Sequence, residues 1–213
     1  MSADTPVPTR AGRALVVVDL QQVVAPGAPW AIDGVEAILP TVAGLLAAFG
    51  DRSVLTRHRM STAPTGRWVT WTRRWGTLEA EPGLLELLDE VADAVPDGAA
   101  VVDKTRYSAF GAAALAERLD GADPELVIAG CETDCCVAAT MFAAVDAGVA
   151  VTLVSDALVG PDRRGHDGLL AAAARLPEQV RVVPAAEAIG VRFVGGSAGS
   201  WRAREDSNPR PSE

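Results

Sequence analysis

The sequence has few cysteines, fewer basic than acidic residues and no long apolar run. Three cysteines in 213 residues, two of them adjacent, do not make the disulfide framework of a small secreted protein. With 28 acidic residues against 19 basic ones, neither nucleic acid nor an anionic membrane is expected as a partner. No apolar stretch approaches the ~18 residues of a membrane span, and the N-terminus has no signal-peptide pattern. The sequence therefore predicts a cytoplasmic protein.

Lysine is scarcer still. Eighteen of the 19 basic residues are arginine, and Lys104 is the single lysine. An ammonium group can be tuned to lose its proton, whereas a guanidinium group in practice cannot. The lone lysine is therefore a candidate for a proton-transfer or point-charge role, and the alternative is an ordinary surface residue.

Apolar residues are plentiful, at 49%, and they gather in short segments. Residues 14–18 form an unbroken apolar run, which is typical of a strand buried on both faces. Strands are predicted at 14–18, 53–56, 99–102, 126–129, 149–154 and 180–183, and helices at 33–49, 84–94, 109–119, 134–147 and 167–175. This alternation predicts an α/β fold, a three-layer sandwich with a six-stranded, mainly parallel sheet flanked by helices.

Composition also sets the expected limits of the domain. Residues 1–12 are predicted to be a flexible N-terminal arm and residues 195–213 a disordered C-terminal tail, which leaves one domain at 13–194. Within the domain, residues 57–81 are expected to be irregular, and Asp33 is expected to cap the first helix.

Three reactive side chains follow predicted strands. Asp19 ends the first strand, Lys104 comes two residues after the third, and Cys136 lies where a helix begins after the fourth. Because ligands of open α/β sheets gather at the carboxyl ends of the strands, these groups are expected to meet. A helix N-terminus and a nearby ammonium would favour the Cys136 thiolate, and the carboxylate could take and return the thiol proton. The alternative is a cysteine that only fills space and an aspartate that only ends a strand.

Three segments carry a resemblance to a known family. They are ALVVVDLQ at 14–21, DKTRYSAF at 103–110, and GCETDCCVAAT at 130–140, followed by DAG at 146–148. They resemble the strand ending in the catalytic Asp, the Lys-x-x-x-Ser-x-Phe segment and the Gly-x-x-Thr-Asp-x-Cys-Val signature of the isochorismatase-like cysteine hydrolase superfamily. This superfamily includes nicotinamidases, N-carbamoylsarcosine amidases and isochorismatases, and its fold is Rossmann-like. The resemblance covers about residues 13–190.

The resemblance implies a role for each reactive residue. Asp19 would be the general base and acid, Lys104 the charged partner and Cys136 the nucleophile, chosen over Cys135 because the family's nucleophile immediately precedes a valine. The implied reaction is hydrolysis of a C–N bond in a small amide, carbamoyl or ureido compound through a thioester. The chain is expected to form a homo-oligomer, a dimer or a tetramer.

An oxyanion site is implied as well. A cis peptide bond would join Cys131 and Glu132, and the backbone N–H groups of Glu132 and Cys136 would meet the developing negative charge. Glu132 stands where family members often carry a small residue, so we hypothesise that its charge alters substrate choice. Cys135 could form a vicinal disulfide with Cys136, but a reduced packing residue is the expectation in the cytoplasm.

The segment after the second predicted strand differs from that of metal-dependent nicotinamidases, which carry an Asp-x-His pair and a further His. This chain has Thr56-Arg57-His58 there, and its one other histidine is His166. A three-ligand site with imidazole support cannot be assembled from this stretch, so neither a metal nor another cofactor is predicted. His58 is interpreted either as a residue that points into the pocket or as a loop residue, with the loop preferred, and His166 is interpreted as a structural or surface residue.

Residues 57–75 are rich in tryptophan and arginine. They are interpreted either as a pocket wall, with Arg57 or Arg73 meeting a carboxylate, or as a surface for subunit packing. The predicted substrate contacts are Gln21, Arg57, Trp68, Trp75, Tyr107 and Phe110. Phe110, at helical spacing, would equally suit the core.

Two other functions stay open. One is vinyl-ether hydrolysis of an isochorismate-like acid, and the other is a relative that binds a small molecule without catalysis. A nucleotide-binding Rossmann domain is disfavoured because no Gly-x-Gly-x-x-Gly turn follows the first strand.

Overall fold

A six-stranded sheet forms the centre of the molecule. The computed structural model describes residues 12–120 and 123–190, so the predicted tail and nearly all of the predicted arm lie outside the described residues. The strand order is β3-β2-β1-β4-β5-β6, and every neighbouring pair is parallel, which confirms the predicted architecture. The strands are β1 (Arg13–Val18), β2 (Ser53–His58), β3 (Ala100–Lys104), β4 (Glu125–Gly130), β5 (Ala150–Leu158) and β6 (Val180–Val183).

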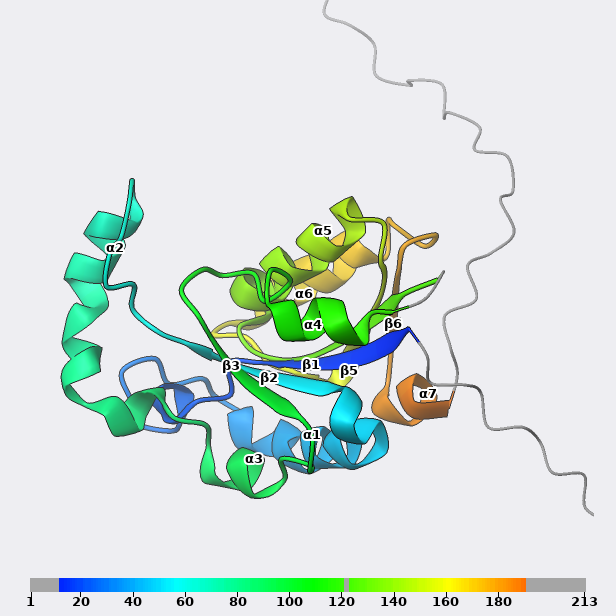
Figure 1. The fold of residues 1–213 in the computed structure, drawn as a ribbon, viewed down its shortest axis with the longest axis horizontal. Helices are drawn as coiled ribbons and strands as arrows, with labels where there is room; N and C mark the ends of the chain where they lie inside the picture. Colours follow the sequence, from blue (N-terminus) through cyan, green and yellow to red (C-terminus); the bar gives the residue numbers. More distant parts are fainter. Residues whose placement is uncertain (1–11, 121–122, 191–213) are drawn as a thin grey trace, which may run out of the picture.

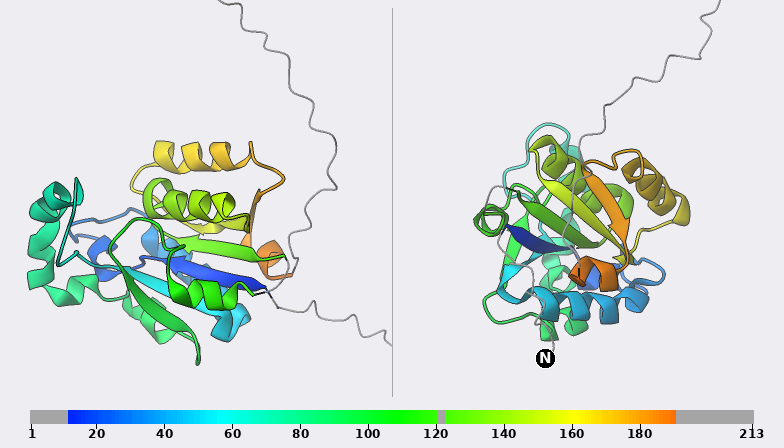
Figure 2. Two further views of the ribbon diagram at one scale, coloured as in Figure 1. Left: turned by 45° about the horizontal axis from the view of Figure 1, so that its top comes forward. Right: turned by 90° about the vertical axis from the view of Figure 1, so that its right-hand side faces the viewer.

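Helices cover both faces of this sheet (Figure 1), and Figure 2 shows the same layers from two further directions. One layer holds α1 (Val35–Phe49), α3 (Asp89–Asp93) and α7 (Ala185–Gly190), and the other holds α4 (Ala113–Arg118), α5 (Ala138–Asp146) and α6 (Arg163–Ala173). In β1, Leu15 and Val17 pack into the α1 side of the core and Val16 into the α5 side. The strand is apolar without alternation because both of its faces are buried.

The first helix agrees with its predicted apolar face. Its buried side chains are those of Val35, Ile38, Leu39, Val42, Leu45, Leu46 and Phe49. Its start differs from the prediction, because Gly34 precedes the helix with φ 82° and no side chain, that of Asp33 included, caps it. A left-handed entry suits glycine and replaces the expected aspartate cap.

The segment predicted to be irregular contains a helix, α2 (Trp68–Trp75), so that prediction is wrong. Trp68, Trp71 and Trp75 recur at spacings of three and four, which is the signature of one helix face. Figure 1 shows α2 at one end of the molecule, beyond the two helical layers.

The helix predicted at 84–94 is present only in its second half, as α3, because the backbone before it pairs with a distant segment. The Leu88 N–H donates to the Leu20 carbonyl at 2.9 Å, and Gln21 and Leu87 form an antiparallel bridge. The chain is therefore extended between two short helices. The remaining short elements are η1 (Gln22–Val24), η2 (Gly50–Arg52), η3 (Gly76–Ala80), η4 (Pro82–Leu85) and η5 (Thr133–Val137).

The order in which strands are added to the sheet reverses between β1 and β4. From β1 the chain continues outward to β2 and β3, and from β4 to β5 and β6, so a crevice is expected at the carboxyl ends of the two central strands. Lys104 is the last residue of β3, rather than following that strand by two residues. No helix in the described part of the chain is long and apolar enough to cross a membrane.

Gly130, the last residue of β4, provides a test of how closely β4 approaches the backbone of β1. Its φ is 109°, and a Cβ atom there would lie 2.2 Å from the Val18 carbonyl oxygen. We expect Gly130→Ala to lower the free energy of unfolding by about 3 kcal/mol or more, because backbone strain adds to overlap with a strand that cannot move. Urea unfolding measures this change.

The matched control is Gly44→Ala in α1, where an added Cβ meets nothing within 4 Å. It should change stability by no more than about 1 kcal/mol. Similar effects of the two substitutions would contradict the role assigned to Gly130.

Candidate active site

Of the three side chains that the sequence singled out, Lys104 contacts the other two through its ammonium group. Lys104 Nζ lies 2.6 Å from Asp19 Oδ2 and 3.5 Å from Cys136 Sγ, and it donates to the Arg106 carbonyl at 3.0 Å. Asp19, Lys104 and Cys136 are all buried. The structure thus brings together groups from the ends of β1 and β3 and from the segment after β4.

The backbone of Asp19 adopts an uncommon conformation. Its φ is 49°, and no other non-glycine residue in the described ranges has a positive φ. Thr56 on the neighbouring strand holds it, since its hydroxyl donates to Asp19 Oδ1 at 2.7 Å and accepts from the Asp19 N–H at 3.2 Å. The sequence analysis missed Thr56. Its only signal is a polar residue in an apolar strand next to β1.

Cys136 lies on a π-helical turn, η5, that leads into α5. The Val137 N–H donates to the Glu132 carbonyl at 3.1 Å, and the Cys136 carbonyl accepts from the Thr140 hydroxyl at 2.7 Å. Such wider turns occur frequently at functional sites. The peptide bond between Cys131 and Glu132 is cis, as the family resemblance implied.

The same threonine links the turn to the loop that follows Lys104. The Thr140 hydroxyl accepts the Ala109 N–H at 2.9 Å, so the segment after β3 is fixed against the start of α5. On the other side, the Thr133 hydroxyl lies 3.0 Å from His166 Nδ1, which gives His166 a structural contact from α6. The turn that carries Cys136 is therefore held from both directions.

The sequence predicted that Cys136 would be a thiolate, but the groups around its sulfur favour the neutral thiol. The hydrogen-bonded Cys135 thiol, burial and the Asp19 carboxylate raise the pKa of Cys136, and the Lys104 ammonium opposes them without prevailing. The ammonium lies closer to Asp19 than to the sulfur, so the carboxylate balances much of its charge. We infer that Cys136 rests as a thiol and needs a base when it reacts.

Lys104 itself stays charged. Burial would lower its pKa, but the Asp19 carboxylate opposes that effect, and the pKa lies above its ordinary value. The lone lysine is therefore a positive charge beside Asp19 and Cys136, which favours the point-charge role over proton transfer.

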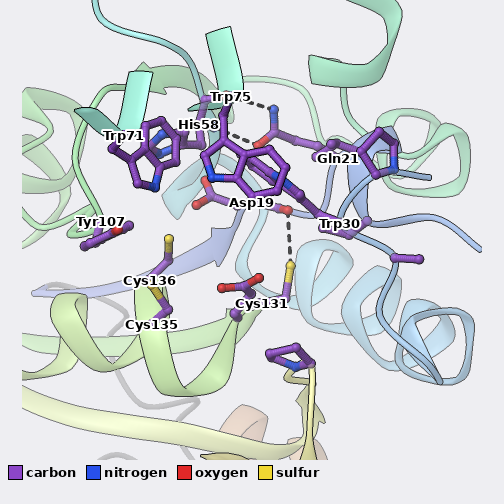
Figure 3. Close-up of a pocket in the computed structure, with 16 residues that line it drawn as sticks. Asp19, Gln21, Trp30, His58, Trp71, Trp75, Tyr107, Cys131, Cys135 and Cys136 are labelled. Carbon is purple, nitrogen blue, oxygen red and sulfur yellow. Dashed lines mark hydrogen bonds between the residues drawn. The ribbon is translucent and has the colours of Figure 1, made fainter. Parts of the chain in front are cut away.

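Asp19 and Cys136 line a cavity of about 300 Å³ that opens to the surface, and Lys104 contacts both of them without lining it. Figure 3 shows Trp71, Trp75 and His58 on one side of it and Cys135 and Cys136 on the other. Among the predicted substrate contacts, Gln21, Trp75 and Tyr107 line the cavity, whereas Arg57, Trp68 and Phe110 do not, nor does Arg73.

The predicted contacts that miss the cavity have other partners. Arg57 donates to Asp103 at 2.7 Å and pairs with Glu86. Phe110 packs against the α5 side of the core. Trp68 packs against two residues that line the cavity, with its ring centroid 4.8 Å from that of Tyr107 and 5.4 Å from that of Trp71. The cavity therefore lacks both arginines, Arg57 and Arg73, that the sequence suggested as contacts for a substrate carboxylate.

The interpretation of His58 as a loop residue is wrong. It is the last residue of β2, is only 4% exposed and lines the cavity. Gln21 fixes its backbone, accepting from the His58 N–H at 2.7 Å and donating to the His58 carbonyl at 3.2 Å. The ring lies among tryptophans, with centroids 5.1 Å from Trp71 and 6.4 Å from Trp30. Neither ring nitrogen has a hydrogen-bond partner among the described residues.

The sequence analysis also missed Trp30, which lines the cavity from the loop before α1. Its N–H donates to the Val23 carbonyl at 2.9 Å, which folds the loop back over the site. No local pattern marks this residue, because its place depends on contact with Trp71 and Trp75 in α2.

Burial of His58 predicts a pH effect on stability. Burial and the Lys104 ammonium lower the pKa of His58 from 6.5 to about 4. Between these values the unfolded chain binds the proton and the folded chain does not, so stability present above pH 6.5 is lost on acidification. Between pH 7.5 and pH 5, the wild type should lose about 1–2 kcal/mol more than His58→Gln in urea unfolding. Equal losses would contradict a neutral buried imidazole.

Comparison with known proteins supports the fold and the family. The Isochorismatase domain family matches residues 13–187. A cysteine hydrolase from Pseudomonas syringae pv. phaseolicola has a TM-score of 0.70 at 20% identity, over 88% of this chain and 97% of that one. An isochorismatase family protein from Desulfovibrio vulgaris has a TM-score of 0.67 at 23% identity, over 84% and 96%. A pyrazinamidase of Pyrococcus horikoshii in complex with zinc has a TM-score of 0.64 at 23% identity, over 81% and 99%.

No curated protein matches the chain at a significant level. The solved structures are below 25% identity and establish the fold, whereas the family match spans most of the sequence. The chain therefore belongs to the isochorismatase family.

Proposed function

We propose that this chain is a metal-independent cysteine hydrolase that cleaves a C–N bond of a small amide, carbamoyl or ureido compound. One observation carries the proposal: a buried ammonium contacts both a carboxylate and a thiol beside a cavity large enough for a small molecule. Such a set supplies a nucleophile, a proton acceptor and a fixed positive charge. Membership of a family of hydrolases supports the reaction class.

In the first half of the proposed reaction, Cys136 Sγ attacks the substrate carbonyl carbon and forms a C–S bond. The Asp19 carboxylate takes the thiol proton, which the raised pKa of Cys136 makes necessary. The protonated Asp19 then gives this proton to the leaving nitrogen as the C–N bond breaks. The products of this half are a free amine and a thioester on Cys136.

The second half returns the enzyme to its starting state. Asp19 takes a proton from water, and the hydroxide adds to the thioester carbonyl. The C–S bond breaks, Cys136 recovers its proton from Asp19, and a carboxylic acid leaves. Lys104 keeps its charge throughout and positions both partners. The N–H groups of Glu132 and Cys136 are the proposed donors to the oxyanion in each half.

The donor set does not fit a zinc site like that named for the Pyrococcus pyrazinamidase structure. Within 12–120 and 123–190, no group of three His, Cys, Asp or Glu side chains is arranged to hold a metal ion. The proposed steps therefore use protein groups. An isochorismate-like acid is the weaker candidate, because no Lys or Arg of the described residues lines the cavity to meet a carboxylate.

Ammonia release from a panel of small amides, ureas and carbamoyl compounds tests this function. We expect hydrolysis of at least one compound, reduced at least about 10²-fold in Cys136→Ala and in Asp19→Asn because each removes a group needed for acylation. Cys135→Ser is the matched control, since it removes the neighbouring thiol and leaves a hydroxyl in its place, and it should keep at least a tenth of the rate.

Two results would contradict the proposal. One is a folded wild type that hydrolyses no member of the panel, which would favour the binding relative without catalysis. The other is loss of activity in Cys135→Ser with retention in Cys136→Ala, which would make Cys135 the nucleophile.

A further inference from the structure

The cavity contains an acidic side chain without a cationic partner. Glu132 lines the cavity and is half-buried, yet it forms no ion pair with any described lysine or arginine. The Cys135 thiol favours the ionised form of Glu132, but a thiol is a weak donor. A carboxylate in such a place is poorly solvated and poorly paired, so a positive charge in the cavity would stabilise it.

The nearby cations are engaged elsewhere. Lys104 pairs with Asp19 at 2.6 Å, and Arg59 pairs with Glu86 at 2.6 Å. Arg106 is exposed, has its guanidinium carbon 4.9 Å from the ring centroid of Trp68 and does not line the cavity. The negative charge of Glu132 is therefore left for a ligand.

The rest of the wall is suited to a cation. Trp30, Trp71 and Trp75 line the cavity, and indole rings attract ammonium groups through their negative faces. Between them, the unpartnered ring of His58 is more than nine-tenths buried and lines the same space. A neutral imidazole has one nitrogen lone pair, which accepts a hydrogen bond from an ammonium N–H.

The protonation states agree with this geometry. Burial, followed by the Asp134 and Asp19 carboxylates, raises the pKa of Glu132, so its ionised form lacks a stabilising charge. Burial and the Lys104 ammonium keep His58 neutral by lowering its pKa to about 4. A carboxylate-bearing compound would meet neither a cation nor a protonated imidazole on this wall.

We propose that the substrate carries a positively charged ammonium group, held against Trp30, Trp71 and Trp75 with Glu132 as its counter-charge. The proposal rests on the hydrolase function above and names the chemical class of its substrate. The amide carbonyl would face Cys136 while the ammonium group occupies the tryptophan side of the cavity. Glu132 and His58 are then specificity residues of the site.

Ligand binding to the Cys136→Ala protein tests the proposal without turnover. Three probes share one planar amide and differ only in charge: para-aminomethylbenzamide is a cation, para-methylbenzamide is neutral and para-carboxybenzamide is an anion. Quenching of tryptophan fluorescence at pH 7.5 gives each dissociation constant. We expect the cation to bind at least about tenfold more tightly than the neutral amide, and the anion to bind most weakly.

Two further variants in the same background locate the preference. Glu132→Gln should reduce the preference for the cation to less than about threefold, because it removes the counter-charge and keeps the shape. Glu178→Gln, which removes an exposed charge before β6, should leave the preference unchanged. The proposal is overturned if the cation binds no better than the neutral amide, if Glu132→Gln keeps the preference, or if no probe binds at millimolar concentration.

This outcome is separable from that of the proposed function. If the cation is preferred while the wild type hydrolyses nothing, the ammonium site stands and the hydrolase fails. If amides are hydrolysed without preference for a positive charge, the hydrolase stands and the ammonium site fails.

Discussion

The contact of the Lys104 ammonium with Asp19 and Cys136 is the interaction on which the site depends. A buried cation is costly unless a carboxylate lies beside it, so Lys104 and Asp19 need each other. The Cys135 thiol and burial raise the pKa of Cys136, and the Lys104–Asp19 pairing leaves little positive charge to oppose them, so Cys136 remains protonated until a base acts. The base available is the carboxylate that already contacts the lysine. In the proposed reaction, this ion pair therefore also sets the proton path, because its carboxylate is the base.

The fold supplies this contact by aligning strand ends. Asp19 and Lys104 follow or end strands on either side of β2, and Thr56 of β2 holds the aspartate between them. Gly130 lets β4 pass close to Val18, so that the turn carrying Cys136 begins beside Asp19. The cavity then forms at the carboxyl ends of β1 and β4, where the strand order reverses, as is general for open parallel sheets.

Much of this architecture could be predicted from sequence because it rests on local patterns. The apolar run before Asp19 indicated a strand buried on both faces, and the apolar spacing of residues 35–49 indicated the buried face of α1. Lys104 was conspicuous as the single lysine in an arginine-rich chain. Each of these signals lies within a few residues of the feature it predicts, so it can be recognised without knowledge of the tertiary contacts.

The walls of the cavity could not be predicted in the same way. His58 is buried only because Trp30 and Trp71, from two distant segments, pack around its ring. Arg57, one residue earlier in the same strand, pairs with Asp103 and Glu86 instead. Alternation along a strand predicts that the two side chains point to opposite faces, but not which face borders the cavity. The protonation state of Cys136 likewise depends on how closely Asp19 pairs with Lys104. Such features arise from tertiary contacts and had to be read from the structure.

The rate of Cys136 alkylation by iodoacetamide as a function of pH tests the central ion pair most directly. Peptide mass spectrometry would follow Cys136 in the wild type and in Asp19→Asn. Because a protonated thiol is unreactive, the wild-type rate should be low at pH 7 and rise with pH. Removing the Asp19 charge frees the ammonium to stabilise the thiolate, so Asp19→Asn should react about tenfold faster at pH 8. An equal or slower rate in Asp19→Asn, or a wild-type rate that is already fast and independent of pH at neutrality, would contradict the account.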